Sequence, residues 1–140
     1  MSYWLAMLLG LLILPAQADD FSYPLKPQQV APNTAVLEGK TEDFSRQNGG
    51  YIVNTAYIST PQGAIVIDTG PSKRFGEHQR TLIEKETGKP VLRVYITHHH
   101  PDHFLGNQAY ADVPIYALSA TTQGIQREGE AFSDNMYRMV

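Results

Sequence analysis

The chain has 140 residues, a formal net charge of −3 and no cysteine. Without cysteine, neither a disulfide framework nor a thiolate metal site can form, so any metal must be held by nitrogen and oxygen. A charge this small and mixed indicates neither a nucleic-acid partner nor an anionic membrane surface.

The N-terminus has the pattern of an export signal. No charged side chain occurs in residues 1–18, where an apolar run over residues 5–14 is followed by a small-x-small pattern that ends at Ala18. The run is too short for a comfortable membrane span. We therefore predict a signal peptide cleaved after Ala18, a periplasmic or secreted protein without stable membrane insertion, and one domain over residues 19–140. A retained N-terminal anchor stays an alternative, because no lysine or arginine precedes the run.

The first part of the predicted domain is extended. Residues 19–32 are polar and carry three prolines, which favours an extended lead-in over a helix. A short strand is expected over residues 34–38. Residues 39–50 are rich in charge and glycine and predict a loop, in which Gly49 and Gly50 permit tight backbone geometry.

A hairpin and a helix follow. The sequence Pro-Gln-Gly at residues 61–63 predicts a turn that joins strands 51–59 and 64–67 into a β-hairpin. Residues 72–87 are compatible with a helix capped by Ser72 and stopped by the following glycine and proline. Its apolar face is thin, which predicts a surface helix.

The last elements complete an alternation of strands and helices. Residues 91–96 and 113–117 are rich in β-formers, and a helix is expected to begin near Ser119. This alternation, without internal repeats, predicts the α/β class.

Four of the five histidines and one carboxylate lie between Thr97 and His103. In an extended segment side chains alternate, so His98 and His100 project to one side. The proline that follows turns the chain and brings the next two side chains to the same point. The spacing therefore predicts ligands for two adjacent cations, zinc first, with iron or manganese as alternatives. The predicted ligands are His98, His100, Asp102 and His103.

Three further residues have weaker patterns. His99 projects away from the predicted ligands and is expected to pack or donate a hydrogen bond. His78 lies on the predicted surface helix and is expected to be solvated. Asp68 ends an apolar strand, where it can accept the second N–H of a ligand histidine. The alternative for Asp68 is a turn cap at a strand end.

The order of these motifs resembles the metallo-β-lactamase superfamily. The resemblance rests on Asp68-Thr69-Gly70, a helix, an apolar strand, residues 97–103 and then Phe104-Leu105-Gly106-Asn107. Residues 41–45, Asn48-Gly49-Gly50 and Asn54 are also similar to the quinoprotein relay-type zinc metallohydrolases, which are periplasmic proteins associated with PQQ-dependent systems. The similarity runs through most of residues 23–140.

The resemblance implies an αββα sandwich with two zinc ions at one edge of its sheets. His98 and His100 would bind the first ion, and Asp102 and His103 the second. A hydroxide between the ions would attack an ester, thioester or amide of a small-molecule substrate. Asp102 would also be catalytic, by orienting that hydroxide or accepting its proton. A quinoprotein system is the implied association.

The sequence departs from the superfamily after His103. Members take a later histidine for each metal, and usually a bridging aspartate, from the second half of the domain, whereas no histidine follows His103 here. We therefore expect the N-terminal half of a longer hydrolase, with uncovered apolar sheet faces. Completion of the site by a partner chain is the alternative.

Two other functions stay open. One is a non-catalytic, metal-binding accessory protein of a periplasmic quinoprotein, and the other is an iron-dependent sulfur or oxygen redox enzyme of the same fold. Nothing in the sequence selects a lactam substrate.

Overall fold

The computed structural model describes residues 21–139, so the predicted signal peptide lies outside the described residues. Six strands form one sheet in the order β1-β2-β3-β4-β5-β6. The strands are β1 (Pro27–Ala31), β2 (Thr34–Leu37), β3 (Thr55–Ser59), β4 (Ala64–Ile67), β5 (Val91–Ile96) and β6 (Ile115–Ala117). The helices are α1 (Lys73–Thr87), α2 (Pro101–Phe104), the 3-10 helix η1 (Leu105–Tyr110) and α3 (Ser119–Met139).

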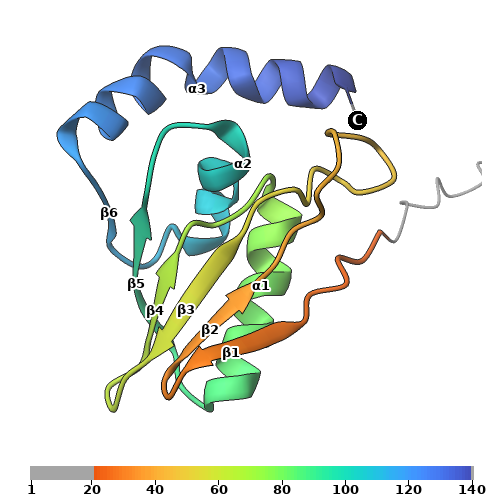
Figure 1. Cartoon of the computed structure of the whole chain (residues 1–140). Helices are drawn as coiled ribbons and strands as arrows, with labels where there is room; N and C mark the ends of the chain where they lie inside the picture. The colour runs from red at the N-terminus through yellow and green to blue at the C-terminus, as the bar shows by residue number, and fades with distance from the viewer. Residues whose placement is uncertain (1–20, 140) are drawn as a thin grey trace, which may run out of the picture.

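The sheet is mixed. Strands β1 to β4 pair antiparallel, whereas β5 pairs parallel to β4 and β6 parallel to β5. A parallel pair needs a crossover, and α1 supplies it between β4 and β5. Figure 1 shows α1 along one face of the sheet and α3 across the end at which β4 and β5 finish. This arrangement confirms the predicted α/β class.

The local signals explain most of the observed boundaries. The predicted hairpin is β3 and β4, although β3 begins at Thr55 and not at residue 51. The predicted helix begins after Ser72, whose side chain accepts a hydrogen bond from the backbone N–H of Phe75. Gly88 ends that helix in the left-handed conformation, at φ 65°. The predicted lead-in is extended, but its residues 27–31 form β1 and pair with β2. Prolines are tolerated there because β1 is an edge strand.

One face of the sheet packs against α1 and η1. Its buried side chains include Ala35, Tyr57, Val66 and Val94. The helix α1 contributes a buried face of Phe75, Gly76, Gln79 and Ile83, so it is more firmly packed than its thin apolar pattern indicated.

The opposite face of the sheet carries an apolar row. Residues paired directly across strands project to the same face. Strand register places five such residues in line across β2 to β6: Val36, Ala56, Ile67, Tyr95 and Tyr116. The two tyrosine rings stack with centroids 5.4 Å apart, and their side chains are 40% and 46% exposed. In Figure 1, α1 lies on one face of the sheet, and no helix of residues 21–139 lies over the other face.

A buried glutamine connects the sheet to the helices. The side-chain amide of Gln79 donates to the Thr55 hydroxyl at 2.8 Å and to the Asp68 carbonyl at 3.1 Å, and its oxygen accepts from the Tyr110 hydroxyl at 2.8 Å. Burial raises the pKa of Tyr110, which therefore stays a donor. Because buried polar groups are costly when unpaired, this network fixes α1 against the backbone that carries Asp68.

None of the helices within residues 21–139 has both the length and the apolar character needed to cross a membrane.

Candidate metal centre

The histidine cluster lies where the chain leaves β5 and enters α2. The ring of His98 has its centroid 4.0 Å from that of His103 and 4.5 Å from that of His100. The extended backbone of His100, with φ −73° and ψ 139°, precedes the proline that starts α2. The structure therefore brings the imidazoles of His98, His100 and His103 together.

Asp68 is held beneath the cluster in a strained conformation. Its φ is 59°, and it is the one non-glycine residue with positive φ within residues 21–139. Aspartate tolerates this left-handed region better than most residues do. Its carboxylate is buried and accepts hydrogen bonds from the Thr97 backbone N–H, the Thr97 hydroxyl and His103 Nδ1, each at 2.8 Å. Backbone strain retained at a polar cluster is typical of a functional site.

These hydrogen bonds determine which nitrogen of each ring is protonated. A carboxylate only accepts, so His103 Nδ1 must carry the proton that it donates to Asp68. The Thr97 hydroxyl has already given its proton to Asp68, so it accepts from His98 Nδ1, which lies 2.9 Å away. In the neutral form of either ring, Nε2 is then the nitrogen without a proton, which is the atom that binds a metal.

The surroundings of His98 favour its neutral imidazole. Burial lowers the pKa of His98, and the neighbouring His103 and His100 lower it further because like charges repel, while Asp68 and Asp102 oppose that shift. A metal ligand must be deprotonated, so this environment suits cation binding.

Asp102 lies at the side of the cluster. Its Oδ2 atom is 3.7 Å from His103 Nε2, and its side chain is 20% exposed. This places a carboxylate oxygen next to the His103 nitrogen that does not contact Asp68. A carboxylate and an imidazole this close together can act as ligands of the same cation or of two adjacent cations.

The donor set fits zinc in its chemistry, because imidazole nitrogen and carboxylate oxygen are ordinary zinc ligands. The arrangement is nevertheless not a closed coordination shell. Within residues 21–139, no three histidine or carboxylate side chains surround one common ion position. Metal binding at this cluster requires either small ring rotations or further ligands.

The other two histidines, His78 and His99, do not belong to this group of three rings. His99 packs its ring against Gly124 of α3, and its Nε2 lies 3.8 Å from a carboxylate oxygen of Glu128. From the sequence, His99 was expected to pack in this loop or to donate a hydrogen bond. His78 was expected to be solvated, and it is partly exposed, with its ring packed edge to face on Tyr23 at a centroid distance of 5.9 Å. Tyr23 lies 55 positions away, a contact that helix periodicity does not reveal.

The contribution of Thr97 was missed from the sequence. Its hydroxyl connects His98 to Asp68, although a threonine that ends a strand is unremarkable in composition. Its position directly before the first histidine was the available signal.

Asp68 gives a testable expectation. Asparagine at this position cannot accept all three hydrogen bonds, because its amide nitrogen is a donor. We expect Asp68→Asn to weaken zinc binding by about 10-fold to 100-fold. Titration against a chromophoric chelator measures the change, with Asp134→Asn, an exposed carboxylate of α3, as the matched control. Equal zinc affinity of the two variants would contradict the role given to Asp68.

Comparison with known proteins agrees with this geometry. A family model described as the metallo-beta-lactamase superfamily matches residues 48–120, just over half of the chain. The linear primary-alkylsulfatase of a Pseudomonas species is 30% identical over 80 residues, which cover 51% of this chain and 15% of that protein. Metallo-beta-lactamase IND-1 of Chryseobacterium indologenes is 26% identical over 93 residues, covering 63% of this chain and 38% of that protein.

A solved structure shows the same fold. The metallo-beta-lactamase from Pontibacter korlensis superposes with a TM-score of 0.63 and 25% identity, over 75% of this chain and 48% of that one. The chain thus spans about half of this structure and less of the curated relatives. The family match over residues 48–120 contains both Asp68 and the histidine cluster, and the sheet and helices around them superpose on a solved member. The chain belongs to the metallo-beta-lactamase superfamily.

Proposed function

We propose that His98, His100, Asp102 and His103 belong to the metal centre of a hydrolase, with zinc as the first candidate ion. The observation that carries this proposal is the hydrogen-bonded arrangement around Asp68. One buried carboxylate, directly and through Thr97, holds the Nδ1 atoms of two imidazoles and leaves their Nε2 atoms without a partner in that hydrogen-bonded arrangement. A turn with only a structural role does not require two imidazoles to be held in this orientation.

The proposed ligand assignment follows the two pairs in the sequence. His98 and His100 would hold one ion, and Asp102 and His103 a second. A catalytic zinc has three protein ligands and an open position, so each proposed pair needs one more ligand, supplied by ring rotation within the cluster or by a further residue. A bound dication supplies ionised water near neutral pH and polarises the group under attack.

Asp102 is the proposed catalytic residue. Its side chain is 20% exposed, against 4% for Asp68, and its Oδ2 atom lies 3.7 Å from His103 Nε2. A carboxylate in that place can orient an attacking water and accept its proton.

The proposed substrate class is an ester, thioester or amide. The names of the relatives include an alkylsulfatase and β-lactamases, so the family's sites accommodate more than one leaving group. The apolar run and the pattern ending at Ala18 support export to the periplasm. The motifs shared with relay-type metallohydrolases support an association with a quinoprotein system.

The test uses the full chain loaded with zinc and, separately, stripped with EDTA. We expect elemental analysis to find bound zinc, and we expect p-nitrophenyl acetate hydrolysis to exceed that of free zinc and to disappear with the chelator. This ester is suitable because its leaving group needs no protein acid.

Other outcomes separate the alternatives. Zinc binding without ester hydrolysis would favour the non-catalytic accessory protein. Iron in place of zinc after purification from the source cells would favour the redox enzyme.

A further inference from the structure

The first half of α3 lies directly against the loop that carries the histidine cluster. Gly124 is buried at this contact, and a Cβ atom at its position would lie 2.6 Å from Cγ of His99 and 2.9 Å from its Cβ and Cδ2 atoms. Side chains essentially never approach a neighbour this closely. Since Cβ is bonded to the backbone, rotation of the imidazole cannot relieve the contact. The close approach of α3 and the loop therefore requires glycine.

His99 contacts both α3 and a proposed ligand. Its ring lies edge to face on that of His100, with centroids 6.0 Å apart. Its Nε2 atom lies 3.8 Å from a carboxylate oxygen of Glu128, which is four residues after Gly124 and hence on the same side of the helix. The side chains of this ion pair are 38% and 42% exposed, so solvent screens it. The packing on Gly124 is thus the firmer link between α3 and the cluster.

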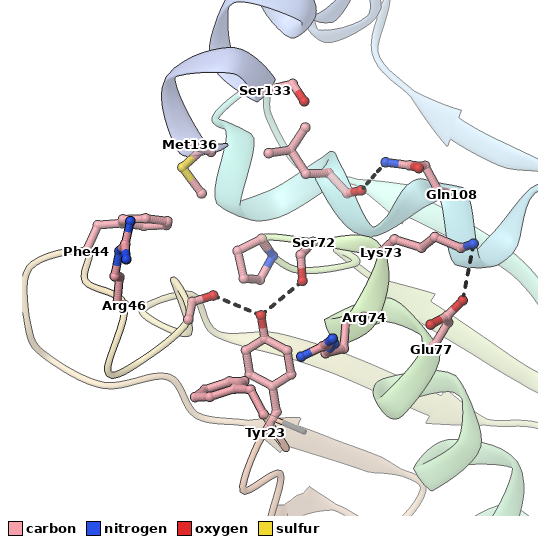
Figure 2. A pocket seen from close by; sticks show the side chains of 14 residues that line it. Tyr23, Phe44, Arg46, Ser72, Lys73, Arg74, Glu77, Gln108, Ser133 and Met136 are labelled. Carbon is pink, nitrogen blue, oxygen red and sulfur yellow. Dashed lines mark hydrogen bonds and ion pairs between the residues drawn. The ribbon is translucent and has the colours of Figure 1, made fainter. Parts of the chain in front are cut away.

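The part of α3 around Gly124 is held by apolar packing. Ile125 and Phe132 pack against the hydrophobic core of the sheet, and moving the helix outward would return them to water. A cavity of about 780 Å³ borders only the last part of α3, where Figure 2 shows Met136 at its upper side. Neither Gly124 nor His99 lines that cavity. A side chain added at position 124 is therefore expected to displace His99 and not the helix.

We propose that Gly124 is a positioning residue of the metal centre, because it leaves the space in which the His99 ring fits against α3. The proposal rests on the proposed function, since it concerns the placement of two of the proposed ligands. His99 is bonded through its backbone to His98 on one side and to His100 on the other. A shift of His99 away from α3 consequently moves both of these rings.

The two ends of the loop are fixed, which confines such a shift to residues 98–100. The Thr97 N–H donates to the Asp68 carboxylate at 2.8 Å, and His103 contacts the same carboxylate at 2.8 Å. Metal affinity depends on how accurately the surrounding residues orient each ligand. Displacement of His98 and His100 relative to the fixed ring of His103 therefore lowers the affinity of the cluster for a cation.

Two glycines of α3 provide a matched test. Gly124→Ala and Gly129→Ala are the same change in the same helix, but a Cβ atom at position 129 meets its nearest atoms at 3.6 Å. We expect Gly124→Ala to weaken zinc binding about 10-fold and Gly129→Ala to leave it within about twofold. Competition with a chromophoric chelator measures the affinity, and denaturant unfolding checks that both variants are folded.

Removal of the His99 ring tests the route of the effect. His99→Ala alone should bind zinc within about threefold of the unmodified chain, because the loop keeps its hydrogen bonds to Asp68. His99→Ala combined with Gly124→Ala should recover the affinity of His99→Ala, since no ring is left to displace. An effect of Gly124 on the helix alone would persist in the double variant.

Histidine ring signals in NMR spectra of the metal-free chain give a readout that needs no zinc. We expect Gly124→Ala to shift the ring signals of His98 and His100, and Gly129→Ala to leave them unchanged. His99→Trp places a larger ring against the same glycine and should shift them too, which keeps the test available if Gly124→Ala does not fold.

Three results would overturn the proposal: unchanged ring signals, equal zinc affinity of the two glycine variants, or no recovery in the double variant. Failure of the proposed function looks different. In that case the ring signals shift as expected, but the unmodified chain binds no zinc.

Discussion

Replacing both His98 and His100 by alanine is expected to weaken zinc binding by at least about 100-fold. The substitution removes two of the four proposed donors, one of them the ring whose Nδ1 is held through Thr97. Loss of a residue that only supports a ligand lowers metal affinity by about 10-fold to 100-fold, so loss of two ligands should lower zinc affinity further. Competition with a chromophoric chelator measures the affinity.

The matched control removes the two histidines that are not proposed ligands. His78→Ala with His99→Ala deletes the same number of imidazoles from the same chain, and it should leave zinc affinity within about threefold of the unmodified protein. If the two double variants lose affinity equally, zinc binding is unspecific and the proposed centre is wrong.

Gly106→Ala should be the most destabilising single substitution near the centre. A Cβ atom at this position would lie 2.0 Å from the carbonyl oxygen of Thr69 and 2.8 Å from its carbonyl carbon. These are backbone atoms, held in place because the Thr69 N–H donates to the His103 carbonyl and the Gly106 N–H donates to the Gly70 carbonyl. We expect the free energy of unfolding to fall by about 3 kcal/mol or more.

Denaturant unfolding measures the loss, with Gly129→Ala as the control. In α3 a Cβ at position 129 meets its nearest atoms at 3.6 Å, an ordinary contact, and alanine is the better helix former by about 1 kcal/mol. The control should therefore be neutral or more stable. Should Gly106→Ala unfold at the same denaturant concentration as the control, the close approach of the two backbone segments would not exist in solution.

Local signals were sufficient for the elements around the centre. Ser72 and Gly88 bound α1 because capping is decided within a few residues. The alternation of His98 and His100 is equally local. Sequence reasoning could therefore place the cluster at the end of β5, beside Asp68.

Contacts between residues that are far apart in the sequence could not be predicted from such local signals. Gln79 looks like a surface residue of an amphipathic helix, yet it is fully buried because Thr55 and Tyr110 satisfy its amide. The pairing of β1 with β2 and the packing of His78 on Tyr23 likewise depend on partners that only the tertiary fold supplies. The close contact of Gly106 with Thr69 has no signature beyond the glycine itself.

The shared carboxylate also links the two proposed ion positions thermodynamically. Asp68 contacts His103 directly and His98 through Thr97, so a change of charge or orientation at one ring is transmitted to the other. Binding of a first cation should therefore alter the affinity for a second, and by reciprocity the second should alter the first by the same factor. Occupancy of such a centre follows a coupled binding curve rather than two independent ones.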